Sequence, residues 1–569
     1  MRKTLLHLVA VSLCGSVGAG ELLPNGIRLP DIWPPMCVSA TNYLPTHVPY
    51  LEPANIPNPI PVDGGRQLFV DDFLVEGMTG LMREWGKPVK YAGNPVMTPK
   101  TPLERNAGGN AACALKGGGV WWDDARKVYR MWYESGWLSA ITYAESKDGI
   151  RWTRPNVGVI AGSNRLIAAD DYRPDSWSVI CDPDADASER WKMFVRRPCH
   201  DYTEAERKWP SARKWTSADG IRWKNAGDCG YVGDRSTLFY NPFRKVWVFS
   251  QRSAWRKEQT WWYRTRSYCE RKEFNGLCKW DYNECEPATS DCPFWMAEDC
   301  LDLPDPAIGD RPQVYDFDAV AYETLFVGII EMLKGPGNLK CERAGLPKIT
   351  DLVFCYSRDG FHFSRPNRAP AIASERWASR KWDAGYVQPC SSICIVTPEK
   401  LRFYYSAFAG ETARTNSVPG KDTSEHPWWK DNGMYANGAI GFAEMRRDGF
   451  AGVKPTDVSG ALVTRPIVFS GRKLFVNANA RIGGCRVEVL SENGKEVLKT
   501  LVLEGRDTVK SCLGDVGAFA KRKVRLRFAL DRATLYSFWI SPYETGESGG
   551  YLGAGGPGYA SLRDCPSVR

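Results

Sequence analysis

A repeated hairpin is the feature that most restricts how this chain can fold, because a recurring segment implies several copies of one structural unit. An apolar strand, a polar turn that ends in Arg-Lys and an aromatic strand occur at residues 120–133 and again at 238–250. Looser copies occur at residues 179–194, 320–327 and 395–405. The sequence therefore predicts five β-hairpins.

A second motif, Ser-x-Asp-Gly followed by an apolar and then an aromatic residue, lies downstream of most hairpins. It occurs at residues 146–152, 217–223 and 357–363, with a shortened copy at 447–450. Asp-Gly is a strong turn signal, so each copy predicts a turn between the outer strands of one unit. The hairpin turns are 59, 59, 82 and 74 residues apart, and they lie at Asp123, Asp182, Asn241, Glu323 and Thr397. Four-stranded units of this size are typical of β-propeller blades.

After Phe450 the pattern changes to strands of alternating hydrophobicity, for example at residues 485–490 and 524–528, which indicates a β-sandwich. We therefore predict an all-β protein, a five-bladed β-propeller followed by a C-terminal β-sandwich. The predicted divisions are a Pro-rich extended arm at 21–61, the propeller at 62–458 with a Cys-rich insertion at 269–310, and the sandwich at 459–569. Residues 62–76 are expected to supply a strand that helps to close the propeller.

The N-terminus has the pattern of a secretory signal peptide. Met1-Arg2-Lys3 precede an apolar stretch at residues 5–17 and small residues at 18–20. No later segment has the roughly 20 consecutive apolar residues that a membrane helix needs. The sequence predicts a signal peptide at 1–20 and a secreted or periplasmic protein without a membrane span.

Composition narrows the choice of partner. The net charge of +9 is modest for 569 residues, and Lys and Arg are scattered along the chain, which argues against nucleic acid as a partner. Aromatic residues make up 12% of the chain, including 23 Trp, a composition that suits strands and the stacking of sugar rings. Carbohydrate is the expected partner.

Cysteine is concentrated in the predicted insertion. Of the 18 cysteines, five lie there, namely Cys269, Cys278, Cys285, Cys292 and Cys300. Exported proteins can form disulfides, so we expect some of these five to be linked, with the pairing left open. The chain has no Cys-x-x-Cys pair and only 5 His, so the sequence predicts no metal site, and no cofactor is expected.

Carboxylates recur at one offset from the hairpin turns. The residues seven positions before the five turns are Lys116, Asp175, Asp234, Asp316 and Cys390. The inner strands of a propeller begin at its central funnel, so these side chains should converge on one pocket. Asp318 lies on the same face of its strand as Asp316. We predict Asp175, Asp234, Asp316 and Asp318 as catalytic residues. The competing interpretation is that Asp only caps the loop before each strand.

Convergent carboxylates provide the chemistry of glycoside hydrolysis, in which one acts as acid and another as base or nucleophile. The residues assigned to substrate binding are Arg235, Lys116, Trp177, Trp382 and Gln388. A guanidinium can orient a carboxylate or bind an acidic sugar, and a Trp ring can stack on a sugar. The predicted function is a glycoside hydrolase acting on a poly- or oligosaccharide. A non-catalytic glycan-binding propeller is the alternative, and a protein-interaction scaffold is a third interpretation.

Four long motifs carry a family resemblance, at residues 66–76, 240–248, 469–477 and 549–558. With them the chain resembles a group of secreted bacterial proteins similar to the N-terminal five-bladed propeller of family 32 and family 43 glycoside hydrolases. The resemblance covers nearly the whole chain after the signal peptide and implies a propeller, a sandwich and a polysaccharide-degrading role. Enzymes of those families use carboxylates from their first three blades. This sequence differs, because Lys116 takes that offset in the first unit and the Trp-Met-Asn-Asp-Pro-Asn nucleophile motif is absent.

Overall fold

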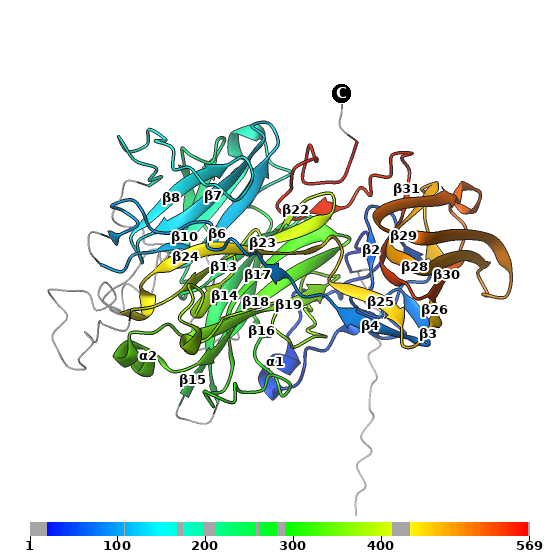
Figure 1. The fold of residues 1–569 in the computed structure, drawn as a ribbon, viewed down its shortest axis with the longest axis horizontal. Helices are drawn as coiled ribbons and strands as arrows, with labels where there is room; N and C mark the ends of the chain where they lie inside the picture. Colours follow the sequence, from blue (N-terminus) through cyan, green and yellow to red (C-terminus); the bar gives the residue numbers. More distant parts are fainter. Residues whose placement is uncertain are drawn as a thin grey trace, which may run out of the picture.

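The computed structural model describes residues 20–106, 109–167, 175–196, 212–257, 261–278, 280, 291–411 and 433–566. Its regular structure is nearly all β, with two short α-helices, α1 (Val38–Asn42) and α2 (Asn338–Ala344). Figure 1 shows a larger body and, on its right, a smaller one that contains strands β28 to β31. None of the described helices is long and apolar enough to cross a membrane. Residues 1–19 of the predicted signal peptide lie outside the described residues.

The described residues of the larger body form four sheets, of seven, four, five and five strands. The seven-stranded sheet consists of two antiparallel parts joined by one parallel bridge, so five antiparallel groups are distinguished, numbered in chain order. Group 1 has β6 (Cys113–Asp123), β7 (Val128–Ser135) and β8 (Ala140–Ser146), and group 2 has β9 (Trp177–Cys181), β10 (Trp191–Arg196), β11 (Ala212–Ser217) and β12 (Lys224–Cys229). Group 3 has β13 (Thr237–Asn241), β14 (Val246–Lys257), β15 (Trp261–Arg271) and β16 (Phe294–Met296). Group 4 has β17 (Gln313–Glu323), β18 (Leu325–Gly335), β19 (Ile349–Ser357), β20 (Ile372–Ala373) and the late strand β32 (Tyr551–Leu552). Group 5 has β21 (Gly385–Gln388), β22 (Ile395–Val396), β23 (Lys400–Phe408), β24 (Gly438–Arg446) and the early strand β5 (Val89–Lys90).

The five predicted hairpins are confirmed. They are β6–β7, β9–β10, β13–β14, β17–β18 and β22–β23, all antiparallel. Apolar and aromatic side chains from these strands fill the cores of the groups, for example Trp132, Phe249 and Phe317. The repeated sequence pattern therefore corresponds to a repeated structural unit.

Contacts between the groups follow a closed order. Gly118 of group 1 bridges Ser178 of group 2, and Gly117 bridges Cys390, which follows β21 of group 5. Side-chain hydrogen bonds connect the remaining neighbours. These bonds run from Leu238 N to Ser178 Oγ at 3.1 Å, from Thr237 Oγ1 to Phe317 O at 2.5 Å and from Thr350 Oγ1 to Val387 O at 2.7 Å. Each group thus contacts the next, and the fifth contacts the first.

The Ser-x-Asp-Gly copies fold in the same way. In each copy the Ser hydroxyl accepts a hydrogen bond from the Gly N–H three residues later, at 2.9 Å for Ser146, 2.8 Å for Ser217 and 2.9 Å for Ser357. The turn then receives a bond from the preceding group, as when Trp132 Nε1 donates to Gly220 O at 2.8 Å. The motif therefore helps to join neighbouring groups.

The smaller body is one curled sheet of eleven strands. Its members are β1 (Ile60–Pro61), β2 (Gln67–Leu68), β3 (Val75–Thr79), β4 (Leu81–Trp85), β25 (Ala451–Pro455), β26 (Ser459–Thr464), β27 (Ile467–Val468), β28 (Lys473–Ser491), β29 (Val497–Asp515), β30 (Val524–Asp531) and β31 (Thr534–Ser541). The expectation that residues 62–76 close the propeller is wrong, because β2 pairs with β31 and β3 with β26. Phe69 packs on Phe528 and Phe538 inside this body, which accounts for the pairing. The strand before the first hairpin that does join the larger body is β5, which pairs with β24.

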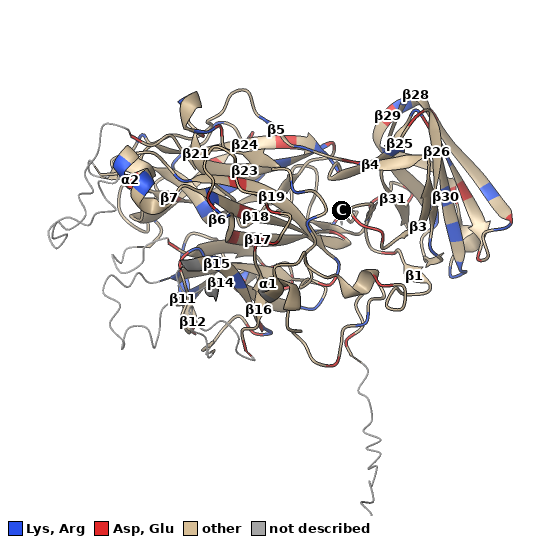
Figure 2. Cartoon of the chain, turned by 90° about the horizontal axis from the view of Figure 1, so that it is seen from below, with Lys and Arg blue, Asp and Glu red and all other residues tan. Residues whose placement is uncertain are grey.

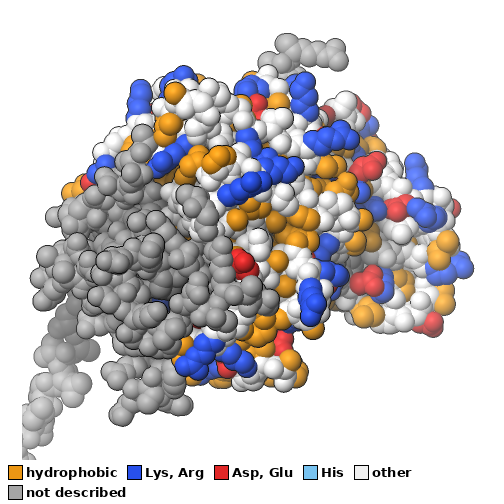
Figure 3. Space-filling model, turned by 60° about the vertical axis from the view of Figure 1, so that its left-hand side comes forward, with side chains coloured by type: hydrophobic (Ala, Val, Ile, Leu, Met, Phe, Trp, Pro, Cys, Tyr) orange, Lys and Arg blue, Asp and Glu red, His pale blue; other side chains and the backbone are white. Residues whose placement is uncertain are grey.

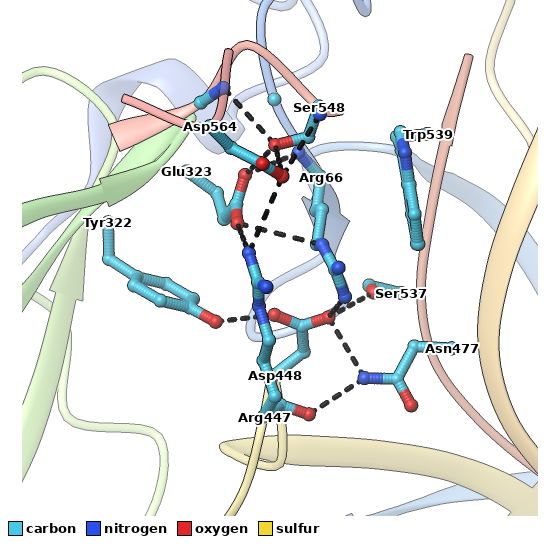
Figure 4. A network of polar contacts seen from close by, with 12 residues as sticks. Arg66, Tyr322, Glu323, Arg447, Asp448, Asn477, Ser537, Trp539, Ser548 and Asp564 are labelled. Atoms are coloured by element: carbon cyan, nitrogen blue, oxygen red, sulfur yellow. Dashed lines mark hydrogen bonds and ion pairs between the residues drawn. The ribbon is translucent and has the colours of Figure 1, made fainter. Parts of the chain in front are cut away.

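A buried ionic network joins the two bodies (Figure 4). Arg66 Nη1 donates to Asp448 Oδ2 at 2.8 Å, and the Arg66 backbone N–H donates to Glu323 Oε2 at 3.0 Å. Arg447 Nη2 donates to the other oxygen of Glu323 at 2.9 Å. Asn477 Nδ2 and Ser537 Oγ of the smaller body also donate hydrogen bonds to Asp448 Oδ2, at 2.9 and 2.6 Å. Glu323 is therefore a structural residue at the junction.

The Cys-rich insertion contains one close pair of cysteines. Cys269 of β15 and Cys292 lie at disulfide distance, with Cα atoms 4.7 Å apart. Cys278 lies beside Lys214, whose Nζ is 2.8 Å from its sulfur, and Cys300 is exposed. Cys285 lies outside the described residues. Among the four cysteines of the insertion that the structure describes, it thus selects one candidate pair.

Charged side chains of both signs are distributed over both bodies. Figure 2 shows Lys and Arg interspersed with Asp and Glu along the strands of each body. On the face in Figure 3, hydrophobic side chains alternate with Lys and Arg. The scattered charge of the sequence is therefore also scattered in space.

Candidate functional site

Backbone irregularities mark the place where inner strands of three groups meet. The register shifts within β6 around Lys116, within β17 at Tyr315 and within β21 around Tyr386. Lys116 and Tyr386 have φ values of 43° and 47°, and Arg235 at the start of group 3 has 60°. Bulges and left-handed residues redirect side chains and are frequent beside functional sites. We call the side chains gathered here the central cluster: Lys116, Glu134, Asp175, Arg196, Arg235, Tyr315, Asp316, Asp318, Glu331, Lys348, Tyr386 and Gln388.

Asp175 is held between two cations. Lys116 Nζ donates to its Oδ1 at 2.8 Å, and Arg196 Nη1 donates to its Oδ2 at 2.9 Å. Burial opposes ionisation of Asp175, but the charges of Lys116 and Arg196 outweigh burial and lower its pKa. Its side chain is 24% exposed. Asp175 is therefore an ionised carboxylate that remains accessible.

Glu134 lies nearby on β7, and its pKa is shifted in the opposite direction. It is fully buried, and its Oε1 accepts the backbone N–H of Leu138. Burial raises the pKa of Glu134 to about 7, although the charge of Lys116 opposes the rise. Near neutral pH Glu134 is therefore only partly ionised, whereas Asp175 is ionised, and both interact with Lys116.

A second ionic set surrounds Arg235. Its Nη2 lies 2.5 Å from Asp316 Oδ2 and also pairs with Glu331 of β18. The backbone N–H of Phe317 donates to Asp316 Oδ1 at 2.7 Å. Burial raises the pKa of Glu331 to about 7, against the charge of Arg235. Asp316 is thus fixed in place by two donors.

Asp318 is buried two residues further along β17. Burial raises its pKa well above the ordinary value, and the charge of Asp316 adds to the rise. Neither of its carboxylate oxygens has a well-aligned hydrogen-bond partner among the described residues, although the nearby Ser391 side chain opposes the rise of its pKa. The same holds, within that part of the chain, for Glu134 Oε2, Glu331 Oε1 and Gln388 Nε2. Buried polar atoms are rarely left without a partner, so these four residues are unusual for a packed core.

Tyrosines and a lysine form another edge of the cluster. Lys348 Nζ donates to Tyr315 Oη at 2.9 Å, and Tyr315 Oη lies 3.4 Å from Tyr386 Oη. Burial alone would raise the pKa of Tyr315, but the charges of Lys348 and Arg264 lower it to about 7. Tyr315 is therefore close to the point of ionisation at neutral pH.

The structure brings together six of the nine residues expected at the site from the sequence. They are Lys116, Asp175, Arg235, Asp316, Asp318 and Gln388, whose Oε1 accepts from Ser406 Oγ at 3.1 Å. Asp234, adjacent to Arg235, forms an ion pair with Arg252.

The two tryptophans do not join this set. Trp177 cannot stack on a sugar as expected, because it has no exposed surface. Its ring is part of the hydrophobic core shared by groups 1 and 2. Trp382 stacks on Tyr405 with ring centroids 5.4 Å apart, beside Asp383 and Lys90.

Sequence reasoning missed the other six residues of the central cluster: Glu134, Arg196, Tyr315, Glu331, Lys348 and Tyr386. Glu134 and Glu331 lie on the second strand of their hairpins, and Glu331 pairs directly with Asp316. Extending the predicted hairpin register across the turn would have found Glu331, whereas Glu134 lies opposite Ala114 because a bulge interrupts the register of β6. Tyr315 and Lys348 have no repeat signal, because a bulge displaces the first and a loop carries the second.

Among the described residues, no group of three or more His, Cys, Asp and Glu side chains is arranged to hold a metal ion. Neither known protein families nor curated proteins match the sequence.

Solved structures give distant matches. An N-acetylgalactosamine deacetylase from F. plautii, in complex with blood group B trisaccharide, is 14% identical over 65% of this chain and 97% of its own, with a TM-score of 0.40. An exo-β-1,3-galactanase from Phanerochaete chrysosporium is 9% identical over 78% and 99%, with a TM-score of 0.32. A β-fructofuranosidase from Schwanniomyces occidentalis is 9% identical over 80% and 96%, with a TM-score of 0.35. At such low similarity, the chemistry of the central cluster has to be judged from its own side chains.

Proposed function

We propose that the protein is a glycoside hydrolase that cleaves a poly- or oligosaccharide in the axial pocket of a five-bladed β-propeller, with a β-sandwich formed by the smaller body. Five antiparallel groups that contact each other in closed order support the propeller assignment. The groups would be its blades, and the central cluster would line the axis. The signal-peptide pattern of residues 1–20 supports action outside the cytoplasm.

The observation that carries the proposal is the contrast between Glu134 and Asp175. Both interact with Lys116, yet burial raises the pKa of Glu134 to about 7 while Lys116 and Arg196 outweigh burial at Asp175 and lower its pKa. Glycoside hydrolysis needs one protonated carboxyl that donates to the leaving oxygen and one ionised carboxylate. Environments that separate the pKa values of two acids are how enzymes assign these two roles.

The roles follow from these environments. Glu134 would donate the proton, and Asp175 would activate water or attack the sugar as nucleophile. Asp316 and Glu331 would hold Arg235, which would orient the substrate. Asp318, which keeps its proton, would donate a hydrogen bond to a sugar hydroxyl. This chemistry requires no cofactor.

Binding without cleavage is the alternative, and one observation favours it. Three of the aspartates predicted as catalytic each form an ion pair with a cationic side chain. These pairs are Asp175 with Lys116, Asp234 with Arg252 and Asp316 with Arg235. Such pairing would leave the protein able to bind a glycan while it restrains the carboxylates.

The test is turnover of a panel of plant, algal and mucin glycans by the purified protein, with Asp175→Asn and Glu134→Gln beside it. Each substitution should keep the fold and reduce the rate by roughly 10²- to 10⁴-fold. Asp182→Asn is the matched control, because Asp182 lies in a hairpin turn and accepts the N–H of Asp184 at 3.0 Å, which Asn can also do. Glycan binding without any product would favour the alternative, and absence of both would refute the proposal.

A further inference from the structure

Cationic side chains surround Tyr315 from three directions. Lys348 Nζ lies 2.9 Å from its hydroxyl, and the guanidinium carbons of Arg264 and Arg235 lie 5.0 and 5.8 Å from its ring centroid. Arg264 comes from β15, Arg235 precedes β13 and Lys348 precedes β19. Positive charge from separate parts of the chain is therefore concentrated around one ring.

Two of these cations have no carboxylate partner among the described residues. Arg235 pairs with Asp316 and Glu331, whereas the Arg264 side chain donates to an amide, Gln313 Oε1, at 3.1 Å. The Nε of Arg264 has no hydrogen-bond partner in that part of the chain.

Lys348, only 3% exposed, has the Tyr315 hydroxyl as its hydrogen-bonded neighbour and lies over the rings of Tyr386 and Tyr435, 5.4 and 5.9 Å from their centroids. A buried cation without a counter-ion is costly, and Tyr315 can balance only one of the two charges.

Stacked aromatic rings connect this cationic edge to Lys116 and Asp175. Lys116 Nζ lies 4.2 Å from the Trp137 ring, which stacks on Tyr435 with centroids 4.3 Å apart. Lys348 lies over the same Tyr435. The two unpaired cations are therefore linked to the proposed acid–base pair through the stacked rings of Trp137 and Tyr435.

We infer that Arg264 and Lys348 recognise an anionic substituent of the sugar, a carboxylate or a sulfate ester, and that the substrate is an acidic glycan. This inference rests on the proposed function. A guanidinium matches the two oxygens of either group with parallel hydrogen bonds, and an ammonium adds a point charge. The hydroxyl of Tyr386 would supply a further donor. Arg264 is partly exposed, so the anion can approach from that side.

The test measures binding of matched pairs of polymers by calorimetry. Polygalacturonate is compared with its carboxyl-reduced form, and a sulfated galactan with its desulfated form. An acidic polymer of one pair should bind about 10- to 100-fold more tightly than its neutral form, the range expected for one or two charged hydrogen bonds. The polymer pair that shows the preference distinguishes a carboxylate from a sulfate.

Variants link the preference to the two residues. Arg264→Gln and Lys348→Met should abolish the preference for the acidic form, while Lys348→Arg, which keeps the charge and guards against a folding defect, should retain most of it. Arg481→Gln, at an exposed arginine of the smaller body, should change nothing.

Equal binding of acidic and neutral forms, or a preference that survives both Arg264→Gln and Lys348→Met, would overturn the inference. Failure to bind any of the four polymers would instead count against the proposed glycan function as a whole.

Discussion

Lys116 Nζ lies 2.8 Å from Asp175 Oδ1, and this contact joins the first inner strand of the larger body to the residue just before the second. Both residues belong to the set selected from the sequence by their common distance from a hairpin turn. The contact places Lys116 where its charge also acts on Glu134. One lysine thus influences both carboxyl groups of the proposed acid–base pair.

The first prediction concerns Glu134→Gln. If Glu134 donates the proton, the substitution should lower kcat roughly 10²- to 10⁴-fold, because an amide cannot replace a general acid. KM should change little, since the side chain keeps its shape. Steady-state kinetics on a hydrolysed glycan would measure this, with Asp182→Asn as the control of unchanged kcat. A Glu134→Gln enzyme with more than half the original kcat would remove Glu134 from the mechanism.

The second prediction is a shift of the pH profile in Lys116→Met. Activity should fall as pH rises above about 7, where Glu134 loses its proton. The charge of Lys116 lowers the pKa of both Glu134 and Asp175. Without that charge both pKa values rise, so both limbs of the kcat/KM profile should move to higher pH by about one unit.

Lys116→Arg, which keeps the charge, is the matched control and should leave the profile near its original position. An unchanged profile in Lys116→Met would show that Lys116 does not act on the titrating groups.

The third prediction concerns oxidation of Cys269 and Cys292. Peptide mapping of protein recovered from an oxidising export compartment should find these two cysteines linked, because their Cα atoms are 4.7 Å apart. Replacing both by Ser should cost about 3 kcal/mol of unfolding free energy, given the 23-residue separation. Replacing the exposed Cys512 should cost almost nothing. Recovery of both thiols alkylated without prior reduction would contradict the pairing.

How far the sequence predicted the fold can be judged from residues 66–76 and from the hairpins. Hairpins were predictable because their signals are local: a turn, an aromatic strand and a fixed spacing. The strand partners of residues 66–76 were not predictable, because the sequence of an apolar strand does not specify which sheet it joins. In the structure Phe69 packs against Phe528 and Phe538 of the smaller body. Long-range pairing depends on complementary surfaces that one segment does not reveal.

The same difference between local sequence signals and long-range contacts applies to the site. Lys116, Asp175 and Asp316 share an offset from a turn, so the repeat revealed them. Tyr315 and Lys348 meet only through the fold, as a bulge in β17 sets the position of the tyrosine and the lysine lies between α2 and β19. The protonation states of Glu134 and Asp318 could not be predicted from the sequence either, because burial in the folded protein controls their pKa values.

The fourth prediction tests the junction between the two bodies. Arg66→Met should lower the unfolding free energy by about 3 to 5 kcal/mol, because it leaves the buried carboxylates of Asp448 and Glu323 without one of their cations. Denaturant unfolding followed by tryptophan fluorescence would measure the loss. Arg532→Gln, which removes an exposed pair with Asp531, should change stability by less than about 0.5 kcal/mol. Equal stability of the two variants would mean that the network contributes little to the junction.

The last prediction tests the protonation of Glu134 without needing a substrate. A carboxyl whose pKa is about 7 in the folded protein and ~4.3 in the unfolded chain keeps its proton on folding between these two pH values. Stability then falls as pH rises through this window, because the folded state binds more protons than the unfolded state, and the loss approaches roughly 4 kcal/mol. Glu134→Gln removes this dependence, so the variant should gain stability relative to the original protein between pH 4.5 and pH 8.

Glu375→Gln is the control of opposite sign. Hydrogen bonds from Lys381 and Lys90 lower the pKa of Glu375 to about 2, so its contribution to stability is present above the unfolded pKa of ~4.3 and is lost as pH falls toward 2. Its replacement should therefore become more harmful as pH rises from about 2 to ~4.3, and should be equally harmful at any higher pH. Urea unfolding of the three proteins at several pH values would measure both trends. If Glu134→Gln and the original protein lost stability in parallel up to pH 8, Glu134 would be ionised in the folded state and could not act as the proton donor.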